Sequence, residues 1–155
     1  MYQADAKLQI ADNVARLFHA LDDRDWAALR DICADRLDVE YPARPGVREQ
    51  MPVETLVDEL RSFLPGFTAT HHHAGHPVVT LHDTDRASVK VDVTVTHVIG
   101  KEGEDLRSWT IGVRYDFDVA FTGDDWKLTS SRARTIYSQG ENLAHEAVER
   151  ATARG

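Results

Sequence analysis

From residue 67 onward the chain alternates apolar and polar residues with a period of two, which is typical of β-strands with one buried face. Turn-like segments of four or five residues separate four such stretches, and connections this short join antiparallel neighbours. The predicted strands cover residues 68–81, 86–99, 106–121 and 126–138. They exceed the usual strand length of about 5–6 residues, and long strands in a small domain curl. We therefore expect a strongly curved antiparallel sheet.

The first part of the chain has helical periodicity. Apolar residues recur every three or four positions over 6–21, again over 26–33, and from Pro52, placed as the first helical residue, to Leu64. A short alternating strand, 36–41, lies between the second and third helices. These helices can cover the concave side of the sheet. The predicted fold class is α+β, with N-terminal helices packed on the curved sheet.

The length of 155 residues fits one domain, 1–155, with a core over about 6–140 and a mostly polar, peripheral helix over about 141–153. The net charge of −8 argues against a nucleic-acid partner. No apolar run reaches the roughly 18–20 residues of a membrane span, and the N-terminus lacks the apolar centre of a signal peptide. A single cysteine, Cys33, fits a reducing cytoplasm.

Three polar rings fall on apolar faces of the predicted strands: His97, Tyr41 and Tyr115. Each brings a polar group toward the interior, as in a small-molecule pocket. Further residues on these faces, or at the end of the first helical stripe, are candidates for lining that pocket: Trp109, Ile111, Val95 and Leu21. The alternative is that each ring is a core residue whose polar atom bonds to the backbone.

Four histidines occur within residues 71–76, which raises the question of a metal site. Strand parity places His72 and His76 on one face and His71 and His73 on the other, so one ion cannot contact all four. A zinc site would need a third ligand such as His97, and no HExxH motif or cysteine set is present. We expect no metal or other cofactor.

Asp22 directly follows Leu21, the last residue of the first apolar stripe, so its carboxylate can be directed inward. A carboxylate beside a pocket histidine fixes the ring tautomer and stabilises the imidazolium, which makes a general base. The alternative is that Asp22, like Asp23 and Asp25, serves only the turn between two helices.

Several segments together resemble the nuclear transport factor 2-like superfamily, in particular its SnoaL-like branch and the scytalone dehydratases within it. The resemblance spans about residues 10–140. It is carried by Asp22-Asp23-Arg24-Asp25-Trp26, Leu37-Asp38-Val39-Glu40-Tyr41, Met51-Pro52-Val53-Glu54, Thr70-His71-His72 and His97. The family implies a cone-shaped fold, a homo-oligomer such as a dimer or trimer, and chemistry without a cofactor.

The resemblance also implies roles for individual residues. Asp22 would orient His72, which would act as base and then as acid toward a departing hydroxyl. His97 would bind or polarise the substrate, and Tyr41 would hold a water that polarises its carbonyl. Leu21 and Tyr115 stand where the dehydratases have a tyrosine and an asparagine, which suggests a changed substrate or reaction.

Three functions remain open at this point. The first is a cofactor-independent dehydratase- or cyclase-like lyase or isomerase of secondary metabolism, acting on a small cyclic or polyketide-like ketone. The second is epoxide or ester hydrolysis, which would need an Asp/Arg/Asp set directed into the cone. Strand alternation places Arg114 and Asp116 on the outer face instead. The third is a non-catalytic small-molecule-binding or assembly module, which an Asp22–His72 separation beyond about 4 Å would favour.

Overall fold

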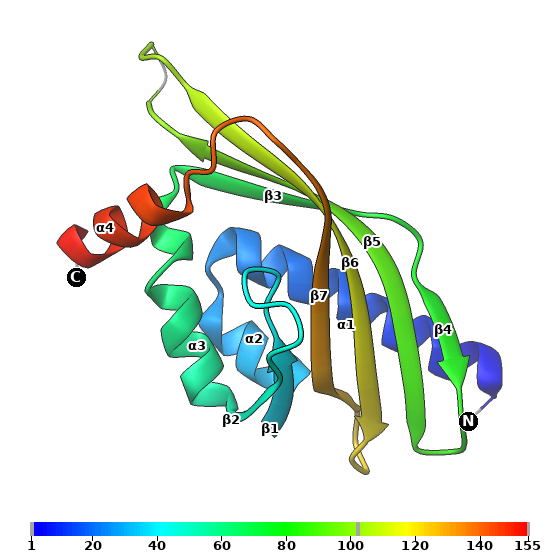
Figure 1. Cartoon of the computed structure of the whole chain (residues 1–155). Helices are drawn as coiled ribbons and strands as arrows, with labels where there is room; N and C mark the ends of the chain where they lie inside the picture. Colours follow the sequence, from blue (N-terminus) through cyan, green and yellow to red (C-terminus); the bar gives the residue numbers. More distant parts are fainter. Residues whose placement is uncertain (1, 102, 155) are drawn as a thin grey trace.

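The computed structural model describes residues 2–101 and 103–154, and its centre is a bent sheet with helices on its concave side (Figure 1). The strands run in the order β2-β1-β7-β6-β5-β3, and β4 also pairs with β5. Their bounds are β1 Cys33–Glu40, β2 Glu49–Pro52, β3 Ala69–Ala74, β4 Val78–Leu81, β5 Arg86–Ile99, β6 Arg107–Phe121 and β7 Trp126–Gln139. The α+β class and the curved sheet are confirmed.

The helices are α1 Gln3–Asp23, α2 Trp26–Ile32, α3 Val53–Arg61, the short 3₁₀ helix η1 Leu64–Gly66, and α4 Ala144–Arg154. The α1 stripe, including Ile10, Val14 and Phe18, is buried against the sheet because its period matches one helix face. Asp25 caps α2 by accepting a hydrogen bond from the backbone N–H of Ala28 at 3.0 Å.

Three details differ from the sequence-based expectation. The segment 68–81 forms two strands, because Gly75-His76-Pro77 interrupts the pairing with β5. Pro52 precedes α3 as its N-cap, with extended backbone angles, instead of being the first helical residue. The sheet is not wholly antiparallel: β1 pairs with β7 in parallel, and β2, which the sequence did not predict, pairs with β1.

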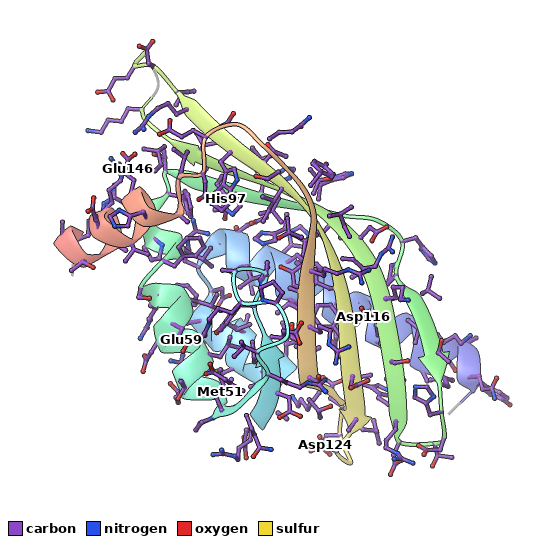
Figure 2. All side chains as sticks on the ribbon, in the orientation of Figure 1. Met51, Glu59, His97, Asp116, Asp124 and Glu146 are labelled. Carbon is purple, nitrogen blue, oxygen red and sulfur yellow. The ribbon has the colours of Figure 1, made fainter. Side chains whose placement is uncertain are left out.

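The core has two parts. The larger lies between the sheet and α1, α2 and α3. The smaller lies at the end of the sheet where α4 packs on η1, and it contains Phe67, Ile99, Trp109, Leu143 and Ala147. Figure 2 places His97 near this end and Asp124 at the opposite end. Thus α4, expected to be peripheral, buries Ala147, and Leu143 just before the helix is buried with it at this end of the sheet.

No helix within the described part of the chain is long and apolar enough to cross a membrane.

Candidate active site

Asp22 and His72 meet where the end of α1 passes the edge strand β3. Oδ1 of Asp22 lies 2.6 Å from Nδ1 of His72, and Oδ2 accepts a hydrogen bond from the His72 backbone N–H at 2.9 Å. A strand at the edge of a sheet has backbone N–H groups without a strand partner. The Asp22 carboxylate satisfies one of these groups and the imidazole together, which fixes the ring relative to the helix.

Two further side chains hold the carboxylate. The Thr70 hydroxyl lies 3.1 Å from Oδ1 of Asp22, and Nη1 of Arg24 donates to the same hydroxyl at 2.7 Å. Since a guanidinium only donates, the Thr70 hydrogen is left to bond Asp22. Arg24 ends α1 in the left-handed conformation, with φ of 57°, and also donates to the carbonyl of Leu64 at 2.8 Å. Sequence analysis gave Arg24 no role, because such a residue after an aspartate pair suggests only a turn.

The ionisation state of Asp22 results from opposing effects. Burial by itself would raise the pKa of the Asp22 carboxyl, but hydrogen bonds from the His72 ring and backbone, together with the Thr70 hydroxyl, hold it below its usual value. The side chains of His72 and Asp22 are only 6% and 15% exposed. Asp22 therefore remains an anion against a shielded imidazole.

The contact with Asp22 determines which ring nitrogen of His72 bears the hydrogen. Because the carboxylate faces Nδ1, the hydrogen of the neutral ring is on Nδ1 and the lone pair is on Nε2. Among the described residues, Nε1 of Trp126 is the one fully buried side-chain nitrogen or oxygen without a hydrogen bond. Nε2 of His72 is therefore not completely enclosed, and its lone pair can accept a proton.

His97 lies on β5, is 4% exposed, and packs among aromatic rings. Its ring stacks on Trp109 with centroids 4.5 Å apart and contacts Phe67 at 4.8 Å. Burial lowers the pKa of His97 to about 4, although the nearby carbonyl of Trp109 opposes the shift. That carbonyl lies 3.0 Å from Nδ1, which therefore bears the hydrogen. His97 is a neutral imidazole whose Nε2 is a hydrogen-bond acceptor.

Burial of His97 makes stability depend on pH. Between about pH 6.5 and 4 the unfolded chain binds a proton at His97 that the folded chain does not. We expect the free energy of unfolding to fall as the pH is lowered through this range, by up to about 3 kcal/mol. Urea unfolding from pH 7 to 4.5, compared with His97→Gln, measures this contribution. Parallel pH curves for the two proteins would contradict it.

A cavity of about 100 Å³ lies beside the hydrogen-bond network of Asp22, between the helices and the sheet. Its lining is mostly aliphatic, with Tyr41 from the end of β1, Tyr115 from β6, and Leu21 from α1. The Tyr41 hydroxyl donates a hydrogen bond to Oε2 of Glu59 on α3. Sequence analysis missed Glu59, although its position three residues after Leu56 places it at the border of the apolar stripe of α3.

The structure separates this cavity from the histidines. Phe18, only 2% exposed, stacks on the His72 ring at 5.6 Å and meets the Tyr115 ring edge-on at 5.3 Å. The described cavity lining includes Leu21, Tyr41 and Tyr115 among the predicted site residues, but not Asp22 or either histidine. The sequence could not predict this division, because it depends on the orientation of one aromatic ring.

Val95, Ile111 and Trp109 also lie outside the cavity, contrary to the expectation that they line it. Val95 pairs with both His72 and Ile111, so these residues form one row across the sheet. Trp109 packs against His97 in the smaller part of the core. Val95 and Trp109 are thus the direct cross-strand neighbours of His72 and His97, and Ile111 lies one strand beyond Val95.

The remaining residues of the histidine cluster are exposed. The rings of His71 and His73 lie 6.3 Å apart on the outer side of β3, and His76 is in the break before β4. Within residues 2–101 and 103–154, no three histidine, cysteine, aspartate or glutamate side chains are placed to hold a metal ion. Arg114 is also on the outside, paired with Asp92 at 2.7 Å.

Comparison with solved structures shows the same fold in several proteins. Kfla4162 from Kribbella flavida is 25% identical, with a TM-score of 0.82 over 94% of this chain and 99% of that one. A Novosphingobium aromaticivorans protein provisionally named a scytalone dehydratase is 18% identical, with a TM-score of 0.72 over 90% and 93%. A type 2 hexachlorocyclohexane dehydrochlorinase, LinA, is 17% identical, with a TM-score of 0.76 over 90% and 91%.

Sequence comparison gives the family. No curated protein sequence matches this chain. The model of the SnoaL-like domain matches residues 3–132, which include Asp22, His72, His97 and both cavity tyrosines. This match covers most of the chain, and the neighbours share the cone-shaped architecture that the sequence resemblance implied. The chain therefore belongs to the SnoaL-like domain family of the nuclear transport factor 2-like superfamily.

Proposed function

We propose that this protein is a cofactor-independent lyase or isomerase that removes a proton next to the carbonyl of a small cyclic ketone. The 2.6 Å contact between Asp22 and Nδ1 of His72 is the observation that carries the proposal. It leaves the lone pair on Nε2, the arrangement that a general base requires. A protein that only binds a ligand gains little from such a pair.

The other polar groups supply complementary interactions. The Tyr115 hydroxyl makes no hydrogen bond to another residue within the described part of the chain, and burial raises its pKa to about 12, so it keeps its proton. It is suited to donate to the enolate oxygen that forms when the substrate loses a proton. His97, neutral and with a free Nε2, accepts a hydrogen bond from a substrate hydroxyl.

A substrate that fills the cavity reaches His72 only if the Phe18 ring moves. This ring contacts both His72 and Tyr115, so its rotation would join the cavity to Nε2 of His72. We infer that substrate binding displaces Phe18.

The comparisons support the same class of chemistry. The structural neighbours include proteins named for dehydration and for dehydrochlorination, and both names describe eliminations without hydrolysis. At 17–18% identity these neighbours are evidence for the shared fold only. The observation that supports the proposed chemistry in this chain is the Asp22–His72 contact.

Proton exchange tests the proposal without knowledge of the natural substrate. Small cyclic ketones, such as tetralones and cyclohexanones, are incubated with the protein in D₂O, and loss of the α-proton signal is followed by NMR. We expect exchange to be faster than in buffer for at least one ketone, and the acceleration to be lost in His72→Ala. Exchange at equal rates with both proteins would overturn the proposal.

The alternative is a non-catalytic binding protein, and the separation of the cavity from His72 by Phe18 is the observation that favours it. Such a protein would bind ketones in the cavity, with chemical-shift changes that saturate, and would not accelerate exchange. The same NMR samples distinguish the two functions, since binding and exchange are read from different signals.

A further inference from the structure

The two tyrosines of the cavity have opposite hydrogen-bonding character. A tyrosine hydroxyl has one hydrogen to donate, and that of Tyr41 is directed to Glu59. Burial and this contact both raise the pKa of Tyr41, so the phenol keeps its proton. Toward any other partner the Tyr41 oxygen is an acceptor. The Tyr115 hydroxyl, with no partner among the described residues, is available as a donor.

Glu59 stands behind Tyr41 relative to the cavity. It projects from α3 (Figure 2), and the cavity lining includes Leu56 and Leu60 of that helix but not Glu59. The carboxylate therefore influences the cavity through the Tyr41 hydroxyl. Arg44, whose guanidinium lies 5.7 Å from the centre of the Tyr41 ring, supports the ring from another side.

We propose that Glu59 is a positioning residue that makes Tyr41 a hydrogen-bond acceptor, so that the cavity selects ligands presenting a donor group to Tyr41 and a carbonyl to Tyr115. This inference deepens the proposed function and rests on it for the identity of the reacting carbonyl. It is compatible with the role that the resemblance implied for Tyr41, because a water that donates one hydrogen to the Tyr41 oxygen can donate its other hydrogen to a carbonyl.

Paired ligands test the selection directly. Hydroxyacetophenones and the matching fluoroacetophenones have similar shapes and the same carbonyl, but only the hydroxy compounds donate a hydrogen bond. With the three ring positions scanned by titration calorimetry, we expect the wild-type protein to bind the best hydroxy compound about tenfold more tightly than its fluoro partner, as for one hydrogen bond to a polarised acceptor.

The variants separate Glu59 from general damage. In Glu59→Leu no acceptor remains at position 59 for the Tyr41 hydrogen, which becomes available to the cavity, so the preference should fall to about threefold or less; Tyr41→Phe should remove it. Tyr115→Phe should weaken both ligands and leave their ratio unchanged. Glu54→Gln, an exposed position on the same helix whose carboxylate pairs with Arg30, should behave as wild type.

A wild-type preference near one, or an unchanged tenfold preference in Glu59→Leu, would overturn the inference. The comparison of two ligands cancels any uniform loss of affinity caused by a disturbed fold. The result is also distinct from the test of catalysis. Selective binding without proton exchange would contradict the proposed reaction and support the role of Glu59, whereas exchange without selectivity would do the reverse.

Discussion

Replacing Asp22 with asparagine is expected to slow proton exchange at the α-carbon of a bound ketone by about three to four orders of magnitude. The asparagine oxygen can still accept the backbone N–H of His72, which leaves its amide nitrogen to donate to Nδ1. The ring then carries its hydrogen on Nε2, and the lone pair that would accept the substrate proton is lost. The measurement is the exchange rate by NMR, with ligand affinity measured separately.

Ligand affinity should change little in Asp22→Asn, because the cavity lining does not include this residue. Asp23→Asn is the matched control: it removes the neighbouring carboxylate, which is exposed, and should leave the rate unchanged. Circular dichroism and thermal unfolding establish that both variants fold. If Asp22→Asn and His72→Ala both retain the wild-type rate, the pair is not the base.

Gly66→Ala is expected to destabilise the protein by about 3 kcal/mol and to displace α4. A Cβ at position 66 would lie 1.7 Å from the backbone carbonyl oxygen of Ala147, so η1 and α4 would have to separate. Separation would expose Trp109 and Phe67, against which His97 packs. The pKa of His97, held at about 4 by burial, should then rise toward its ordinary value, which NMR titration of the ring can detect.

Two further variants identify the cause. Gly75→Ala adds the same methyl group where the nearest atom, the carbonyl oxygen of Asp92, is 3.4 Å away, and it should be nearly neutral. Removal of the Ala147 side chain should not rescue Gly66→Ala, because the clash involves the backbone of residue 147. Rescue by Ala147→Gly, or wild-type stability in Gly66→Ala, would contradict this account of the contact.

The elements with strong periodicity could be predicted from the sequence. The positions of α1 and α2, and of β5, β6 and β7, agree with the patterns because local alternation and helical spacing reflect burial on one face. The parallel pairing of β1 with β7 could not be predicted, since period-two alternation says nothing about which distant strand lies alongside. The four-residue β2 is too short to show alternation.

The sequence could predict those features of the candidate site that depend on the pattern within a single helix or strand. Leu21 ends the buried stripe of α1, which indicated that Asp22 could be directed inward, and strand parity separated His72 from His71 and His73. Contacts that depend on two side chains from distant segments were not predictable. Arg24 reaches Thr70 across 46 positions of sequence, and Tyr41 reaches Glu59 across 18.

The parallel ladder between β1 and β7 also bears on how the chain folds. Cys33 is opposite Leu128, so this pairing closes a loop of about 95 residues, and its entropic cost precedes any stabilisation. Topologies dominated by such distant contacts fold in milliseconds to seconds, and their unpaired edges are exposed meanwhile. During synthesis on the ribosome, the edge of β1 that pairs with β7 stays uncovered until β7 has been made. We therefore expect nascent chains that end before residue 126 to expose β1 and to associate with chaperones.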